Sequence, residues 1–221
     1  MHNIVNNLIS IEDELKIKIN DLNLLNYNPN IIAVSKTFSS KTILPLINHG
    51  HIHFGENKVQ EAVEKWTDIK KDLQHIKLHM VGKLQTNKVK FVIPLFDYIH
   101  SVDNLKLAEK ISKEQKKKNK NIKLFIQVNI GNEEQKGGIL IEQLDAFYNT
   151  CIKDLDLNVI GLMCLPPNND KSSIYFSRMQ SLTKKMNLKE ISMGMSNDYL
   201  EAIENKATYL RIGTKIFGER N

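Results

Sequence analysis

A lysine follows directly after an apolar run near the start of the chain. Residues 31–34 are all apolar, and Ser35 and Lys36 come next. A run of this kind predicts a buried strand, so Lys36 is expected where that strand ends. Loss of solvent and a neighbouring cation favour the neutral amine, which is nucleophilic and can form a Schiff base with an aldehyde. The alternative is an ordinary lysine that reaches solvent from a strand end.

Two glycine turns near the C-terminus could hold a phosphate group. Gly194 precedes Ser196 in a turn that leads into a predicted helix, and Gly213 and Thr214 open a second turn. Backbone N–H groups near a helix start attract anions. The alternative is that both glycines serve turn geometry alone. A phosphate site together with a nucleophilic lysine suits an aldehyde-phosphate cofactor, and pyridoxal 5'-phosphate (PLP) is the candidate.

An arginine lies two residues before the second turn. Arg211 and Gly213 share one face of the last predicted strand, because side chains alternate along a strand. If that face points inward, Arg211 could reach the pyridine nitrogen of such a cofactor. A guanidinium cannot accept a proton, so it would keep this nitrogen unprotonated and weaken the ring as an electron sink. The alternative is a salt bridge at the rim of the fold.

An alternation of apolar runs and amphipathic stretches must position these residues. Strands are predicted at residues 31–34, 51–54, 78–81, 97–100, 124–128, 159–163, 190–193 and 209–212. Helices are predicted at residues 4–20, 40–48, 59–66, 87–92, 105–118, 139–152, 172–186 and 198–204. Such alternation is typical of a parallel sheet covered by helices.

Eight repeats of strand and helix favour a closed barrel over an open sheet. The predicted fold class is α/β, a single (β/α)8 TIM-type barrel with an extra N-terminal helix, in which residues 1–221 form one domain. An open doubly wound sheet is the second possibility, although no G-x-G-x-x-G motif follows the first strand. Active sites of such barrels lie at the C-terminal ends of the strands, where Lys36, Ser196 and Gly213 fall.

The composition narrows the functional classes. The chain has 221 residues, of which 41% are hydrophobic and 25% charged, as in ordinary globular domains. Two cysteines, Cys151 and Cys164, favour a reducing compartment, and we expect a cytoplasmic protein. Apolar runs are too short for a membrane span, and the N-terminus has no signal-peptide pattern. We therefore expect no membrane association.

Two clusters, one of lysines and one of histidines, are explained more simply by structural roles than by binding of nucleic acid or metal. The net charge is +6, but the lysine run at residues 116–120 has no interleaved aromatic residues, so we expect no specific nucleic-acid partner. His49, His51 and His53 alternate like metal ligands. No cysteine or acidic cluster accompanies them, so a structural role is favoured and no metal is expected.

The residues named above fall within longer segments that match a known family. The segments are residues 33–37, 54–61, 79–88, 101–103, 127–129, 161–163, 192–196 and 211–218, in this order along the chain. On them the chain resembles the pyridoxal phosphate homeostasis proteins, which are similar to the N-terminal barrel domain of alanine racemase. The sequence departs from that pattern at Cys164-Leu165-Pro166-Pro167, which leaves the shape of this loop open.

The resemblance implies a role for each matching residue. Lys36 would hold PLP as a Schiff base, Asn57 would lie near its ring, and Arg211 would face the pyridine nitrogen. The implied phosphate-binding residues are Ser196, Gly213 and Thr214. Lys136 matches a second lysine that could relay or receive the aldehyde.

Family membership implies cofactor binding more firmly than catalysis. A two-base racemase needs an acid or base on each face of its substrate. Tyr199 and Tyr209 could be considered, although packing roles are favoured for both. The sequence ends at Asn221, soon after the last predicted strand, so we expect no second domain and a monomer. We expect a carrier that buffers PLP and passes it to PLP-dependent apoenzymes, without a reaction of its own. The alternative is a single-domain amino-acid racemase of low activity.

Overall fold

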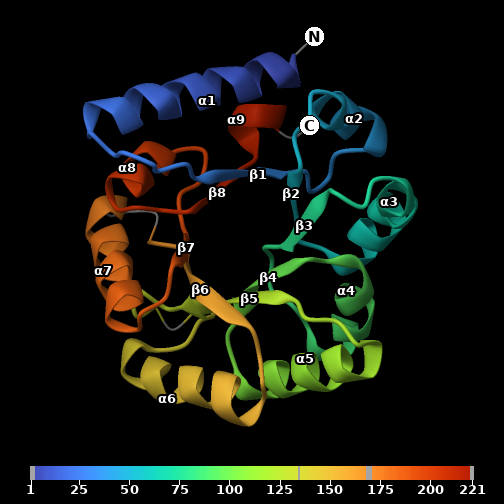
Figure 1. Cartoon of the computed structure of the whole chain (residues 1–221), viewed down its shortest axis with the longest axis vertical. Helices are drawn as coiled ribbons and strands as arrows, with labels where there is room; N and C mark the ends of the chain where they lie inside the picture. The colour runs from blue at the N-terminus through green and yellow to red at the C-terminus, as the bar shows by residue number, and fades with distance from the viewer. Residues whose placement is uncertain (1–2, 134, 168–170, 220–221) are drawn as a thin grey trace.

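Eight parallel strands close into a barrel in the computed structural model, which describes residues 3–133, 135–167 and 171–219. Each strand pairs with the next one along the chain, and β8 pairs with β1 (Figure 1). The strands are β1 Asn30–Val34, β2 His53–Glu56, β3 Lys77–Met80, β4 Tyr98–Val102, β5 Lys123–Val128, β6 Val159–Cys164, β7 Glu190–Ser192 and β8 Tyr209–Ile212. The predicted (β/α)8 fold is confirmed.

Helices surround the barrel, and an additional one precedes it. The helices are α1 Ile4–Asp21, α2 Ser40–Asn48, α3 Val59–Asp72, α4 Val89–Leu95, α5 Leu105–Lys118, α6 Leu144–Asn149, α7 Ser172–Lys185, α8 Tyr199–Glu204 and α9 Thr214–Phe217. The predicted helix at residues 139–152 is present as a continuous helical segment that begins as a 3-10 turn, Ile141–Gln143, continues as α6 and ends as a π-helical turn, Thr150–Asp154. The predicted N-terminal helix is present as α1, and α9 was not predicted.

The first helix forms for local reasons. The Asn3 side chain accepts hydrogen bonds from the Val5 and Asn6 amides, which caps the helix start. Apolar residues at helical spacing then build one buried face of α1, comprising Ile4, Leu8, Ile11 and Leu15. This face packs beside α9 and α2 (Figure 1).

The second strand begins two residues later than the sequence pattern predicts. The His51 amide donates to the Leu46 carbonyl, and the Gly50 amide donates to the Ile47 carbonyl. With Gly50 at a φ of +93°, these bonds form a Schellman motif that ends α2. His51 therefore belongs to a helix end, and β2 starts at His53.

Successive side chains of each strand point alternately into the barrel and outward to the helices, so the molecule has two hydrophobic cores. The larger core lies between the strands and the helices. The smaller one fills the barrel and consists of Ile32, Val34, Tyr98, Phe125, Met163 and Tyr209, with Val81 and Ile160 at its edge. Interiors of such barrels are dominated by branched aliphatic residues, so this aromatic interior is unusual. It also contains three histidines, which are described below.

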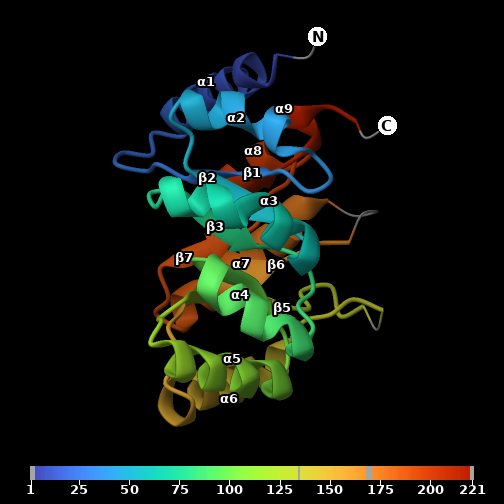
Figure 2. The same ribbon diagram turned by 90° about the vertical axis from the view of Figure 1, so that its right-hand side faces the viewer.

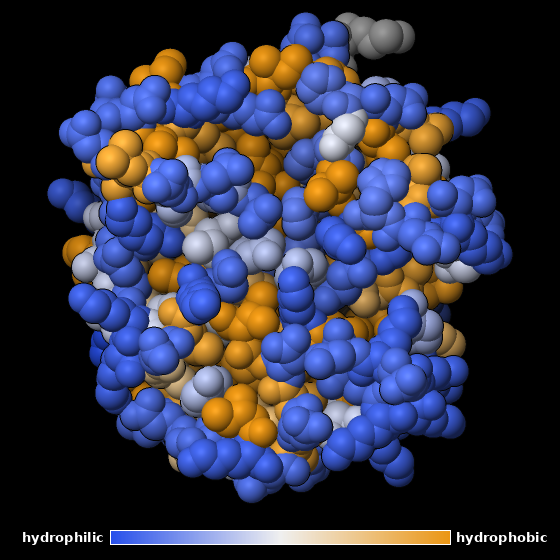
Figure 3. All heavy atoms as spheres, viewed as in Figure 1, coloured by the Kyte–Doolittle hydropathy of each residue, from blue (hydrophilic) through white to orange (hydrophobic). Residues whose placement is uncertain are grey.

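The loops after β5 and β6 project from the same side of the molecule (Figure 2). Parallel strands bring their C-terminal ends to one end of the barrel, so the predicted site residues gather there. The view in Figure 3 shows a mostly hydrophilic surface with small hydrophobic groups between. Among the described helices, none combines the length and apolar character that crossing a bilayer requires.

Candidate cofactor site

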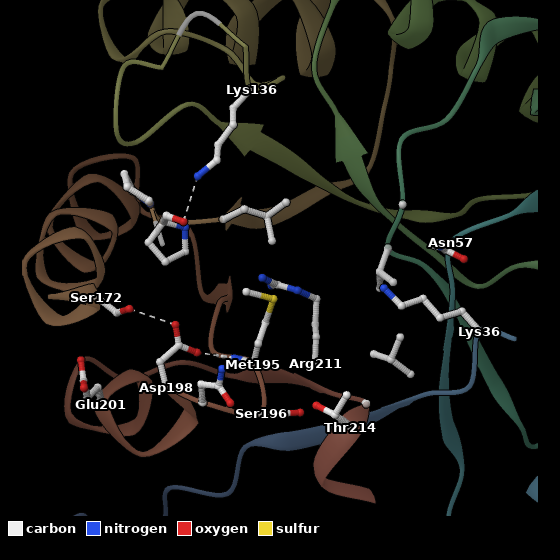
Figure 4. Close-up of a pocket in the computed structure, with 18 of the residues that line it drawn as sticks. Lys36, Asn57, Lys136, Ser172, Met195, Ser196, Asp198, Glu201, Arg211 and Thr214 are labelled. Carbon is white, nitrogen blue, oxygen red and sulfur yellow. Dashed lines mark hydrogen bonds between the residues drawn. The ribbon is translucent and has the colours of Figure 1, made fainter. Parts of the chain in front are cut away.

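A cavity of about 810 Å³ opens among the loops at the C-terminal ends of the strands. Every residue predicted for cofactor binding lines this one cavity (Figure 4). They are Lys36, Asn57, Ser196, Arg211, Gly213 and Thr214. The structure thus brings together residues that are up to 178 positions apart, from Lys36 to Thr214. Their binding roles remain predictions.

The backbone on both sides of Lys36 is tightly held. The Ser35 amide donates to the Gly55 carbonyl at 2.9 Å, and the Ser35 hydroxyl donates to Glu56 Oε1 at 2.8 Å. On the other side, the Thr37 amide donates to Glu61 Oε1 at 2.5 Å. The backbone at Lys36 is therefore fixed, and the Lys36 side chain extends into the cavity toward Arg211 (Figure 4).

A buried carboxylate supports this arrangement and was missed in the sequence. Glu56 is fully buried, and its Oε1 accepts hydrogen bonds from Ser35, from Lys65 Nζ at 2.9 Å and from Trp66 Nε1 at 3.0 Å. Lys65 also donates to the Ser35 carbonyl at 2.8 Å. The sequence signal is weak, because Glu56 and Lys65 meet only when β2 and α3 pack together.

Asn57 lies at the end of β2, against a glycine. A Cβ on Gly82 would come within 2.5 Å of the Asn57 carbonyl oxygen, so only glycine permits this approach. The Ser101 hydroxyl donates to the Gly82 carbonyl at 2.7 Å and holds that segment in place. Asn57 Oδ1 is buried and has no hydrogen-bond partner among the described residues. A buried polar atom without a partner is costly, so this oxygen is available to accept a hydrogen bond from a ligand or from water.

The turn after β7 and the start of α9 form the hydroxyl-lined side of the cavity. Gly194 has a φ of +86°, which a residue with a Cβ rarely adopts. Ser196 Oγ accepts a hydrogen bond from the Lys215 amide at 3.3 Å, which joins the two segments. Ser196 and Thr214 therefore lie side by side (Figure 4). Hydroxyls and N–H groups so arranged can bind the oxygens of a phosphate.

Asp198 also lines the cavity, although no sequence pattern pointed to it. Its Oδ1 accepts from the Met195 amide at 2.6 Å, and its Oδ2 accepts from the Ser172 hydroxyl at 3.0 Å (Figure 4). Both carboxylate oxygens thus have hydrogen-bond partners. Asp198 fixes the turn that carries Ser196 and links it to the start of α7.

Arg211 is buried beneath the cavity, with only 5% of its surface exposed. Its Nη1 donates to the Ser192 hydroxyl at 2.6 Å, and its Nη2 donates to the Cys164 carbonyl at 2.8 Å. Burial lowers the pKa of the guanidinium, while the nearby Cys164 and Asp198 oppose that shift. Among the described residues, no carboxylate forms the salt bridge with Arg211 that was considered from the sequence, and the guanidinium is buried within the barrel.

Lys136 enters the cavity from the loop after β5. Its Nζ donates to the Pro166 carbonyl at 3.1 Å and forms an ion pair with Glu133 at 2.6 Å. Leu165, Pro166 and Pro167 of the loop after β6 also line the cavity, so this departure from the family pattern is part of the site. Lys36 and Lys136 reach into the cavity from different sides (Figure 4).

The remaining sequence candidates lie elsewhere. Tyr199 donates its hydroxyl to Glu14 on α1, and the Tyr209 hydroxyl lies 3.5 Å from that of Tyr98 inside the barrel. No tyrosine is among the described residues that line the cavity. His49 is exposed, and His51 Nε2 lies 2.9 Å from the His53 carbonyl oxygen. Among the described residues, no three or more histidine, cysteine, aspartate or glutamate side chains are grouped so that they could hold a metal ion.

Fold and site together define a barrel of the alanine racemase type. Residues 13–221 match the family described as alanine racemase, N-terminal domain. The chain is 38% identical over 199 residues to the pyridoxal phosphate homeostasis protein of Aquifex aeolicus, which covers 86% of each chain. The chain therefore belongs to the pyridoxal phosphate homeostasis proteins, and the predicted resemblance is confirmed.

Solved structures agree with this assignment. PipY of Synechococcus elongatus, solved without PLP, is 31% identical and has a TM-score of 0.86, over 98% of this chain and 100% of PipY. PipY solved with PLP bound has a TM-score of 0.79 at 31% identity, over 92% of this chain and 100% of PipY. The similarity thus extends over nearly the whole chain.

Proposed function

We propose that this chain binds PLP in the cavity and takes part in PLP homeostasis. The observation that carries this proposal is the convergence of Lys36, a buried Arg211 and the hydroxyls of Ser196 and Thr214 in one cavity. A ligand that suits this set has an aldehyde, a phosphate and a ring atom that accepts a hydrogen bond. The unsatisfied Asn57 Oδ1 also fits a ligand with a polar group on its ring. The family relationship and the PLP-bound PipY support the same cofactor.

Each residue has a distinct proposed task. Lys36 would hold the cofactor by condensation of its neutral amine with the aldehyde, which releases one water molecule. Gly213, Ser196 and Thr214 bind the phosphate, and Asn57 contacts the ring. Arg211 donates a hydrogen bond to the ring nitrogen and keeps it unprotonated, because a guanidinium has no proton-accepting atom. The bound cofactor supplies an electron sink, which this hydrogen bond weakens.

A carrier role is favoured over amino-acid racemisation. A two-base racemase requires a second acid or base on the substrate face opposite Lys36. Tyr199 is bound to Glu14, and Tyr209 lies within the barrel, so neither of these residues is available for that task. We therefore propose that the chain buffers PLP in the cytoplasm as a monomer and supplies it to PLP-dependent apoenzymes.

Cofactor attachment is tested by absorption spectroscopy after incubation with PLP, before and after borohydride reduction. The wild type should show a long-wavelength band that borohydride converts into a covalent adduct on Lys36, located by mass spectrometry of the peptides. Lys36→Ala should lack the band. Lys41→Ala, a change at an exposed lysine on α2, is the matched control and should keep it. A wild type without the band, or an intact band in Lys36→Ala, contradicts the proposal.

Transfer is tested separately, with Lys136 as the residue of interest. Loaded protein is mixed with an apoenzyme in the presence of a scavenger that traps free PLP. Recovery of apoenzyme activity faster than from free PLP supports direct transfer, and equal recovery contradicts it. If Lys136 relays the aldehyde, Lys136→Ala should slow this recovery while the Lys36 adduct still forms. An unchanged rate contradicts the relay.

A further inference from the structure

A line of three histidines crosses the barrel interior and ends at Arg211. His53 Nδ1 lies 2.9 Å from His79 Nε2, and His79 Nδ1 lies 2.9 Å from His100 Nε2. His100 Nδ1 is 2.8 Å from Ser192 Oγ, which accepts from Arg211 Nη1 at 2.6 Å. His53 is the first residue of β2, and Arg211 faces the cavity at the other end. We call these three histidines the histidine chain.

Arg211 determines which ring nitrogen of each histidine in the histidine chain carries the proton. Arg211 can only donate, so Ser192 Oγ is an acceptor toward it. The acceptor that the described residues offer the Ser192 proton is His100 Nδ1, so this nitrogen carries no proton. A neutral His100 is then protonated at Nε2 and donates to His79 Nδ1. By the same reasoning His79 donates from Nε2 to His53 Nδ1. All three rings have the same tautomer.

The rings are held neutral and in fixed planes. Burial lowers the pKa of His79 and of His100 well below the ordinary value, with His100 further lowered by Arg211. The pKa of His53 is lowered to about 4, mainly by burial and then by His51. Tyr98 stacks on His79 with centroids 4.2 Å apart, and Phe125 stacks on His100 at 4.3 Å.

Because the three rings have the same tautomer, the imidazole dipoles of the histidine chain all point in one direction. The unprotonated, electron-rich nitrogen of each ring faces toward Arg211, and the N–H faces away from it. Three imidazole dipoles therefore align with their negative ends toward a buried guanidinium that has no carboxylate salt bridge among the described residues. Aligned peptide dipoles stabilise a cation at a helix C-terminus in the same way.

We propose that the histidine chain holds Arg211 in its charged state and in its orientation toward the ring nitrogen of the cofactor. His53, His79 and His100 are then positioning residues that act through Ser192. The expected effect on PLP binding rests on the proposed function. The proton arrangement of the histidine chain, in contrast, is a property of the protein without cofactor. The competing explanation is that the histidines merely fill the barrel.

The first test uses the cofactor-free protein and nitrogen-15 NMR of the imidazole rings. Protonated and unprotonated ring nitrogens have well-separated chemical shifts. We expect Nε2 protonated and Nδ1 unprotonated in His53, His79 and His100 at neutral pH. A protonated Nδ1 in His79 or His100 would overturn the proposal. Because no PLP is present, this result does not depend on whether the chain binds it.

The second test measures the affinity for PLP and for its analogue in which carbon replaces the ring nitrogen. His100→Leu removes the acceptor for Ser192 and should weaken PLP binding about tenfold, an effect of the size expected for one charge-assisted hydrogen bond. The carbon analogue should bind wild type and His100→Leu equally, because it offers Arg211 no nitrogen. Equal weakening for both ligands indicates a packing effect and overturns the proposal.

Two further variants complete the design. His100→Asn keeps an acceptor near Ser192 and should recover part of the lost PLP affinity. His51→Asn changes a histidine outside the histidine chain, which contacts the His53 carbonyl, and should bind PLP like the wild type. If neither ligand binds the wild type, the proposed function fails while the NMR result still decides the proton arrangement.

Discussion

At the residue scale, two glycines with similar backbone angles differ in their surroundings. Gly50 has a φ of +93° and Gly194 a φ of +86°. A Cβ on Gly50 would meet no atom within 4 Å, whereas one on Gly194 would lie 2.6 Å from the Ala202 Cβ and 3.0 Å from Leu210. The first position therefore requires glycine for its backbone angle alone, and the second also for space.

This pair allows the two costs to be separated. Gly50→Ala should lower the free energy of unfolding by about 1–2 kcal/mol through backbone strain. Gly194→Ala should cost about 1–3 kcal/mol more, because the methyl group overpacks the contact between the β7 turn and α8. Urea unfolding of both variants measures the difference. Equal losses would show that the turn near Ser196 relaxes at little cost.

The predictability of the site also differs from residue to residue. Lys36 and Arg211 could be found because each has a fixed place beside an apolar strand or a glycine turn. Glu56 and Asp198 could not, because their partners Ser35, Trp66 and Ser172 come from other elements. The histidine chain was invisible for the same reason, since its members lie on three strands.

At the element scale, α1 supports the cavity by holding α9, the helix whose first residue, Thr214, lines the cavity. The Asn7 side chain donates to the Ile216 carbonyl on α9 at 2.8 Å, and Lys215 pairs with Glu14 at 2.7 Å. The helix that begins with Thr214 is thus fixed to the N-terminal helix. Substitutions that disrupt α1 should therefore affect both the stability of the fold and the side of the cavity that contains Thr214.

Two isoleucines of α1 form a matched pair for this test. Ile11 is fully buried, whereas Ile17 on the same helix is 62% exposed. Ile11→Ala should lower the free energy of unfolding by about 2–5 kcal/mol, as cavity-forming substitutions do. Ile17→Ala should change it by no more than about 0.5 kcal/mol. Thermal or urea unfolding compares the two, and similar losses would contradict the packing described for α1.

Element boundaries were less predictable than element types. The Schellman motif at Gly50 moves the start of β2, and the helix predicted at residues 139–152 runs from Ile141 to Asp154 and changes from 3-10 to α to π geometry along its length. Hydrophobic periodicity specifies which face of a segment is buried, but not how its ends are satisfied. Such shifts leave the alternation of strands and helices along the chain unchanged. The (β/α)8 fold could therefore be predicted although some boundaries were not.

At the scale of the whole molecule, buried histidines make stability depend on pH. Burial lowers the pKa of His51 and His53 to about 4, from an ordinary value of 6.5. Between these values the unfolded chain binds more protons than the folded chain. Stability therefore falls as the pH is lowered from about 6.5 toward about 4.

The expected slope is about 1.4 kcal/mol per pH unit for each histidine in this window. Urea unfolding at a series of pH values measures it. His51→Asn should remove the contribution of His51 and reduce the slope by about that amount. A slope unchanged by this substitution would show that His51 titrates normally in the folded chain.

Closure of the barrel has a consequence for the order of events during synthesis. β1 pairs with β8 from Asn30 and Tyr209 to Ala33 and Ile212, so the first and last strands complete the sheet together. Lys36 leaves the ribosome well before Arg211 and Thr214, which follow it by 175 and 178 positions. The growing polypeptide therefore has no complete cavity until Thr214 has been synthesised. A ligand that requires Lys36 together with Arg211 and Thr214 can bind only after β8 has paired with β1.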